Sequence, residues 1–155
     1  MISVFVLAFG IGIVAGLRAL LAPAIVAWAA HLGWLNLHGS PLAFMGSTAA
    51  VAIFTVLAIG ELVGDKMPQT PKRTALPSLL ARLVTGGLCG ATLCAAAGKA
   101  LLAGALLGGT GGLIGAFAGY EIRKRLVNNL HIKDFFVAIC EDLVAISLAY
   151  LLVSR

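Results

Sequence analysis

Long runs of apolar residues, separated by a few short polar stretches, dominate the pattern along this chain. A bilayer core of about 30 Å is crossed by about 20 helical residues that rise 1.5 Å each. Five apolar segments approach or exceed that length, so the pattern predicts an all-α integral membrane protein with about five transmembrane segments. We expect a single transmembrane domain over residues 1–155, with segments roughly at 2–31, 43–64, 77–98, 101–122 and 134–153.

The first apolar segment is longer than the others. About 30 residues are more than one straight crossing needs. Two arrangements account for the excess. Either Pro23 kinks one tilted helix, because a proline removes a backbone donor and clashes with the preceding turn, or residues 23–35 form a separate outer segment.

Composition agrees with a membrane protein. Hydrophobic residues make up 61% of the chain and charged residues 11%, whereas a soluble domain is about 25% charged. This balance argues against a nucleic-acid-binding protein, a secreted disulfide scaffold and a disordered chain. The cysteines Cys89, Cys94 and Cys140 stand in apolar runs without metal-ligand spacing, so we expect them to be small buried apolar residues and expect no metal or cofactor.

The basic residues indicate an orientation in the membrane. Seven of the 11 Lys and Arg residues lie in the polar stretches 66–73 and 123–133. Such clusters are typical of cytoplasmic loops. Five crossings would place both stretches and the N-terminus in the cytoplasm, with the C-terminus outside. The sequence therefore predicts a multi-pass membrane protein whose N-terminus and basic loops are cytoplasmic.

Glycines recur at four-residue spacing in the segment at 101–122. Gly104, Gly108 and Gly112 form one ladder, and Gly111, Gly115 and Gly119 form another. Small residues at this spacing let membrane helices approach closely. The ladders predict either packing within the chain or a contact between copies, and we expect a homo-oligomer through these Gly-rich faces.

Two pairs of segments resemble each other. Residues 12–20 (GIVAGLRAL) resemble 115–123 (GAFAGYEIR), and 58–63 (AIGELV) resemble 138–144 (AICEDLV). The first two segments would then be repeated as the last two. Because one further segment separates the pairs, the repeat would be inverted, a construction that recurs in transporters.

Ionisable residues inside or at the ends of apolar segments are the candidate site. Each costs at least about 2.5–3.5 kcal/mol at a helix centre unless it faces a partner or a wet cavity. Helical spacing places Asp134 and Glu141 on one face, and places Asp142 on a stripe of alanines suited to close helix contact, at Ala138, Ala145 and Ala149. The candidate residues are Arg18, Glu61, Asp65, Arg82, Glu121, Glu141 and Asp142.

This cluster has two interpretations. The charges are either structural ion pairs that fix helix register, or a site for an ion, a proton or a small anionic ligand. The second interpretation predicts a small transporter or channel-like protein, which we favour. A scaffold or assembly subunit and an intramembrane enzyme acting on a lipid phosphate are the alternatives, and because the sequence has no catalytic signature, we assign no catalytic residue.

At these residues the chain resembles a family of small bacterial polytopic membrane proteins of unknown function. The resemblance spans nearly the whole chain, and its most distinctive part is GELVGDKMPQTPKRT (60–74). It implies a polytopic inner-membrane protein and no particular activity. The other matching segments are GLRALLAP (16–23), the region of Arg82, AGYEIRKRL (118–126) and CEDLVAI (140–146).

Overall fold

A computed structural model describes residues 3–64 and 75–154, which are helical and contain no strand. Three of the helices, α4, α5 and α6, are long and apolar enough to cross a membrane, and three are shorter apolar helices. By length and composition the fold suits a membrane protein. The order is α1 (Val4–Leu17), α2 (Leu21–His31), a 3-10 turn (Ala43–Gly46), α3 (Thr48–Gly64), α4 (Leu76–Ala96), α5 (Leu101–Asn129) and α6 (Asp134–Val153).

Most of the expected segments correspond to one helix each, but α5 is longer than expected. It continues to Asn129, so most of the expected polar joint at 123–133 is helical. The reason is local: Arg, Lys and Leu are good helix formers, and neither Gly nor Pro interrupts residues 123–129. The turn between α4 and α5 agrees with expectation, since Gly98 has a φ of +67° there.

The first apolar segment breaks at Arg18, so of its two expected arrangements the kink at Pro23 is wrong. Arg18 is extended, with φ −140° and ψ 103°, and ends α1. Pro23 lies in the first turn of α2, where a backbone N–H has no intrahelical partner and its loss costs little. A separate second segment therefore exists, but it begins at Leu21.

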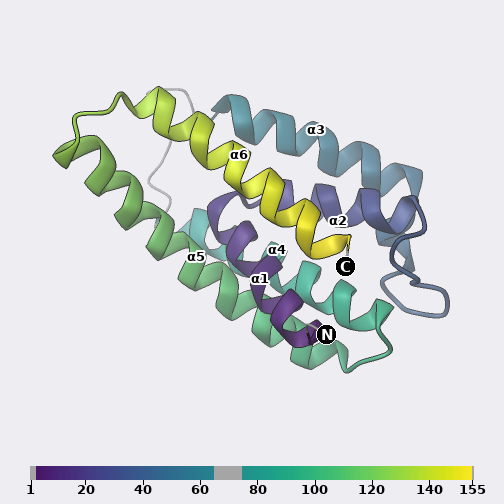
Figure 1. Cartoon of the computed structure of the whole chain (residues 1–155). Coiled ribbons are helices and arrows are strands. Elements are labelled where there is room, and N and C mark those ends of the chain that lie inside the picture. The colour runs from purple at the N-terminus through teal and green to yellow at the C-terminus, as the bar shows by residue number, and fades with distance from the viewer. Residues whose placement is uncertain (1–2, 65–74, 155) are drawn as a thin grey trace.

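Helices α1 and α2 form an antiparallel hairpin (Figure 1). Arg18, at the end of α1, pairs with Asp142 in the first half of α6. Trp34, just after α2, stacks against Tyr150 near the end of α6, with ring centroids 5.8 Å apart. The arms have 14 and 11 residues, or about 21 and 17 Å, so each is shorter than a bilayer core of about 30 Å.

This hairpin changes the expected topology. The start of α1 and the end of α6 line one pocket, and the two termini lie near each other in Figure 1. The end of α5, which carries Arg123, lies far from them. The turn after α1 thus sends the chain back, so that the N-terminus lies at the same end of the bundle as the C-terminus. The side of the membrane on which each terminus and the 123–133 stretch lie stays a prediction.

The glycine ladders pack α5 against α1 and α4. A Cβ on Gly16 would lie 2.6 Å from the amide nitrogen of Ala116, and a Cβ on Gly112 would lie 2.6 Å from the carbonyl oxygen of Arg82. Packing within the chain thus covers these faces. Association of two copies stays a prediction and would need another surface. The glycines in these contacts are Gly12, Gly16, Gly86, Gly90, Gly104, Gly108, Gly111, Gly112 and Gly115.

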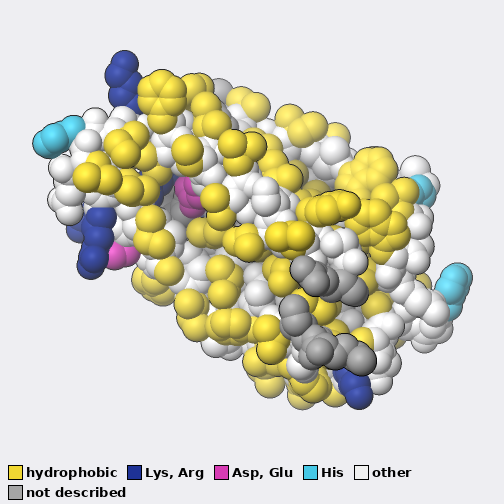
Figure 2. Space-filling view, viewed as in Figure 1, with side chains coloured by type: hydrophobic (Ala, Val, Ile, Leu, Met, Phe, Trp, Pro, Cys, Tyr) yellow, Lys and Arg dark blue, Asp and Glu magenta, His cyan; other side chains and the backbone are white. Residues whose placement is uncertain are grey.

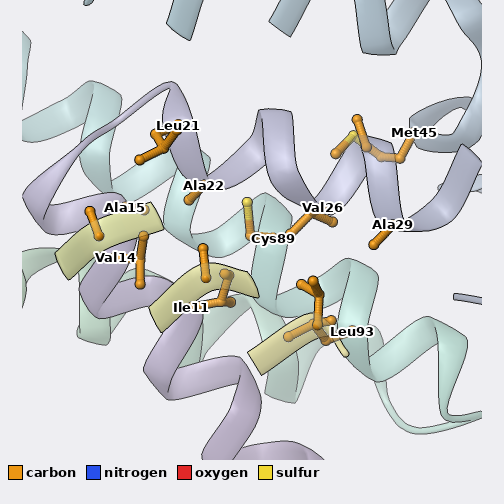
Figure 3. Packing of buried hydrophobic residues seen from close by; sticks show 14 of the residues in the cluster. Ile11, Val14, Ala15, Leu21, Ala22, Val26, Ala29, Met45, Cys89 and Leu93 are labelled. Atoms are coloured by element: carbon orange, nitrogen blue, oxygen red, sulfur yellow. The ribbon is translucent and has the colours of Figure 1, made fainter. Parts of the chain in front are cut away.

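The apolar core lies between the hairpin, α4 and α6. Figure 3 shows Ile11 and Val14 of α1 facing Val26 of α2, with Cys89 and Leu93 of α4 beside them. The expected alanine stripe of α6 is confirmed, since Ala138, Ala145 and Ala149 are fully buried. The close approach of α6 that these alanines permit also carries Asp142 into the interior.

Candidate functional site at the α1–α2 turn

Two charged side chains hold the helix ends at the α1–α2 turn, which we define as residues 18–20. Arg82 of α4 donates a hydrogen bond to the carbonyl oxygen of Gly16 in the last turn of α1. Glu61 of α3 accepts hydrogen bonds from the amides of Ala19 and Leu20, at 2.7 and 2.8 Å. A cation thus faces the negative end of α1 and an anion faces the positive end of α2, which suits both helix dipoles.

Arg18 is the fully buried charge of the turn. Its guanidinium pairs with the carboxylate of Asp142 and lies 4.0 Å from that of Glu141. It also donates to the backbone carbonyl of Ala138 at 3.5 Å. A buried guanidinium is stable only where partners compensate its charge, and here α6 supplies two carboxylates and a carbonyl.

Arg123 of α5 joins the cluster from the opposite side of Glu141. Its Nε and one terminal nitrogen each donate to Asp134, both at 2.8 Å, in a bidentate pair. Its other terminal nitrogen lies 3.6 Å from the carboxylate of Glu141. Glu141 therefore stands between two guanidiniums, one exposed in part and one buried.

A pocket opens between α5 and α6 at this point, and we call it the α5–α6 pocket. Its volume is about 310 Å³, and Glu141 and Arg123 are its charged lining residues. In Figure 2 an acidic side chain is visible at the bottom of a hollow that apolar side chains border. The apolar part of the lining includes Leu17, Ile122, Leu126, Ile132, Phe136 and Val144.

The structure brings five of the seven candidate residues together at the turn: Arg18, Glu61, Arg82, Glu141 and Asp142. Asp65 lies outside the described residues. Glu121 is absent from the cluster, because its side chain is 49% exposed and pairs with Arg125 one turn later on α5. It follows Gly119 by two residues, which on a helix is nearly the opposite face.

Loss of this exposed ion pair is expected to change the stability of the protein very little. Glu121→Gln should change the free energy of unfolding by less than about 0.5 kcal/mol, because an exposed i,i+4 ion pair contributes about that much. Thermal unfolding of the purified protein in detergent would measure it. A larger loss would mean that Glu121 has a structural role beyond this pair.

Arg123 and Asp134 belong to the site, yet they are missing from the expected residues. Arg123 looks like one of three consecutive loop cations, but α5 continues through it. A signal was present: Arg123 follows Gly119 by four residues and so extends the second glycine ladder. Arg82 precedes Gly86 by the same interval and extends the face of α4 that packs on α5.

The cysteines divide into two groups. Cys89 and Cys94 are buried as expected, but Cys140 is exposed. The expectation of a buried Cys140 is wrong because the interior face of α6 carries Ala138 and Asp142, and a residue midway between them points away from it. Cys140 instead lines the α5–α6 pocket beside Glu141.

Fold and site together define a class: a small, all-helical, membrane-type protein with buried charges gathered at the turn of a helical hairpin. Within this class, the chain belongs to the family described as Domain of unknown function (DUF4126), whose model matches residues 5–154. This match confirms the resemblance found in the sequence. No curated protein and no solved structure matches the chain.

Proposed function

We propose that this protein is a small transporter of the bacterial inner membrane, in which the charges at the α1–α2 turn handle a proton together with an ion or small anion. The observation that carries the proposal is the position of Glu141. Its carboxylate lines a pocket and also contacts a fully buried arginine. A group that arrives from outside can therefore reach the interior cluster through one titratable side chain.

The hairpin supports the same proposal. Both arms are too short to cross a bilayer core. Charges from α3, α4 and α6 contact their turn and the end of α1 beside it, and Arg123 of α5 contacts Glu141. In transporters, interrupted helices point their ends at the bound substrate or ion near the middle of the membrane. Here Glu61 and Arg82 occupy these helix ends, which would keep the turn rigid while Glu141 changes partners.

The inverted repeat stays a prediction, and two contacts and the directions of the helices bear on it. In the alignment, Glu61 corresponds to Glu141, and Leu20 corresponds to Arg123. Glu61 accepts a hydrogen bond from the amide of Leu20, and Glu141 contacts the side chain of Arg123. The two halves differ in two respects. The first is broken into α1 and α2 whereas α5 is continuous. In addition, α1 runs parallel to α5, since Gly12 lies against Gly108 and Gly16 against Gly112, whereas the matching helices of an inverted repeat run in opposite directions.

The test is proton movement in proteoliposomes. Vesicles loaded with a pH-sensitive dye and holding an imposed pH gradient would be assayed alone and with added inorganic phosphate, acetate or chloride. We expect Glu141→Gln to abolish the protein-dependent proton flux, because glutamine keeps the shape of the side chain but carries no titratable group. Glu121→Gln, an equal change at an exposed position, should keep the wild-type flux.

Folding of the Glu141→Gln protein separates this proposal from its competitor. If the charges only fix helix register, as in a scaffold subunit, the variant should lose thermal stability and no flux should depend on Glu141. A variant that folds like the wild type but carries no proton supports transport. Wild-type protein that moves no proton with any of these anions contradicts the proposal.

A further inference from the structure

We infer that the α5–α6 pocket binds a single-chain amphiphilic anion, with the anionic group on Arg123 and the apolar chain along the pocket. The inference rests on the proposed function, and it names the substrate class of the same site. Three observations carry it: the volume and lining of the pocket, the unequal contacts of Arg123 and Glu141, and the exposure of both to one opening.

The pocket has room for one apolar chain. Its volume of about 310 Å³ is at the lower end of the range of about 300–1,000 Å³ for small-molecule sites. Aliphatic and aromatic side chains of α5 and α6 form most of its wall, among them Ile122, Leu126 and Phe136. A ligand that fills it must bury an apolar body there and present one charged group to Arg123 or Glu141.

The contacts of the two charged residues decide the sign of that group. Arg123 is fixed by two hydrogen bonds of 2.8 Å to Asp134. Glu141 lies at the longer distances of 3.6 Å from Arg123 and 4.0 Å from Arg18. Because Asp134 lies closer to this guanidinium than Glu141 does, an anion can take the place of Glu141 on Arg123 while Asp134 keeps the guanidinium in position. An anion fits this exchange, since arginine binds carboxylate, sulfonate and phosphate oxygens alike.

A proton would accompany the anion. Glu141 faces Arg18 from the turn and Arg123 from α5, and its neighbours on α6 are Asp134 and Asp142. Once an anion occupies Arg123, a charged Glu141 would repel it, whereas a protonated Glu141 would not. Binding of the anion is therefore expected to be linked to uptake of one proton on the Glu141 carboxylate.

Cys140 provides a direct probe of occupancy. It lines the pocket and is exposed, whereas Cys89 and Cys94 are buried. The rate of Cys140 alkylation by N-ethylmaleimide, followed by mass spectrometry, would be measured in nanodiscs of neutral phospholipid. The probe ligand is dodecanesulfonate, which stays anionic over the accessible pH range. Its controls are dodecyltrimethylammonium, dodecanol and methanesulfonate.

We expect dodecanesulfonate to slow the alkylation of Cys140 at least tenfold, and the three control ligands to leave it nearly unchanged. Glu141→Gln imitates the protonated carboxylate, so half-protection should need at least tenfold less sulfonate near neutral pH and should no longer depend on pH. Glu121→Gln should behave as wild type. Val144→Trp fills the pocket and should abolish protection, whereas Leu143→Trp on the neighbouring exposed face should not.

Several results would overturn the inference. Equal protection by the trimethylammonium compound or the alcohol would show that the pocket does not select an anion. Weaker sulfonate binding in Glu141→Gln would contradict the linked proton. Protection in nanodiscs with anionic phospholipid alone would assign the pocket to bilayer lipid. Alkylation of Cys140 no faster than that of Cys89 would show that the pocket is closed.

Failure of this inference is distinguishable from failure of the proposed transport. Protection of Cys140 requires binding alone, and proton flux in proteoliposomes requires no alkyl chain. Proton flux without protection of Cys140 would support the transporter and exclude an amphiphilic substrate. Protection of Cys140 without proton flux, when dodecanesulfonate is also among the anions added to the proteoliposomes, would support a binding site and exclude the transporter.

Discussion

Gly108→Ala should destabilise the protein by about 3 kcal/mol, although it adds a single methyl group. The added Cβ would lie 2.9 Å from the carbonyl carbon of Gly86 and 3.1 Å from the Cα of Gly90. Both neighbours are backbone atoms, so α4 and α5 would have to separate over their whole contact. Overpacking of a tight interior typically costs about 1–3 kcal/mol, and a shift of two main chains places this variant at the upper end.

Gly60→Ala is the matched control, because it makes the same substitution within a helix of the same protein. Among the described residues, no atom beyond the neighbouring backbone of α3 lies within 4 Å of a Cβ at this position. Alanine is favoured over glycine in a helix by up to about 1 kcal/mol, so this variant should be slightly more stable than wild type. Thermal unfolding in detergent would measure both. Equal effects of the two substitutions would contradict the packing described for α4 and α5.

Arg18→Met should cost about 3–5 kcal/mol of folding free energy, the second large effect. The substitution leaves Asp142 buried beside Glu141 without its guanidinium partner, and an uncompensated buried charge has a cost of this size. The double variant Arg18→Met with Asp142→Leu removes both charges of the pair. It should regain much of the lost stability, because an apolar pair of similar volume often replaces a buried ion pair without loss.

The double variant shows whether the pairing of Arg18 with Asp142, rather than each residue alone, stabilises the fold. A double-mutant cycle should give a coupling free energy of at least about 1 kcal/mol between the two residues, whereas distant independent sites couple by less than about 0.5 kcal/mol. Arg125→Met, at an exposed arginine of α5, should change stability by less than about 0.5 kcal/mol. Additive losses at Arg18 and Asp142 would show that their pairing does not stabilise the fold.

The spacing of residues along the sequence predicts which face of a single helix packs closely against its neighbours. The alanine stripe of α6 and the glycine ladders of α5 follow from spacing alone, because small residues on one face permit close contact whichever partner lies opposite. The same spacing places Asp134 and Glu141 together, and Arg123 contacts both. These local patterns identify the part of the candidate site that lies on α6.

The break at Arg18 does not follow from local pattern, because its causes lie elsewhere in the chain. Residues 18–20 contain neither Gly nor Pro, and their freed backbone groups are satisfied by Glu61 and Arg82 from other helices. Pro23 suggests a kink because the sequence does not show whether a proline lies in the first turn of a helix or in its interior. The position of Glu121 depends similarly on which face of α5 meets α1.

The pairing of Arg18 with α6 has a consequence for the order of synthesis. The residues that join across this contact are 120 positions apart in the chain, and at about 5–20 residues per second the ribosome needs roughly 6–24 s to pass from one to the other. During that interval the first hairpin carries a guanidinium whose partners have not yet been made. These contacts therefore form only after the last helix has been made, and a chain that stops before α6 lacks the two carboxylates that face this guanidinium.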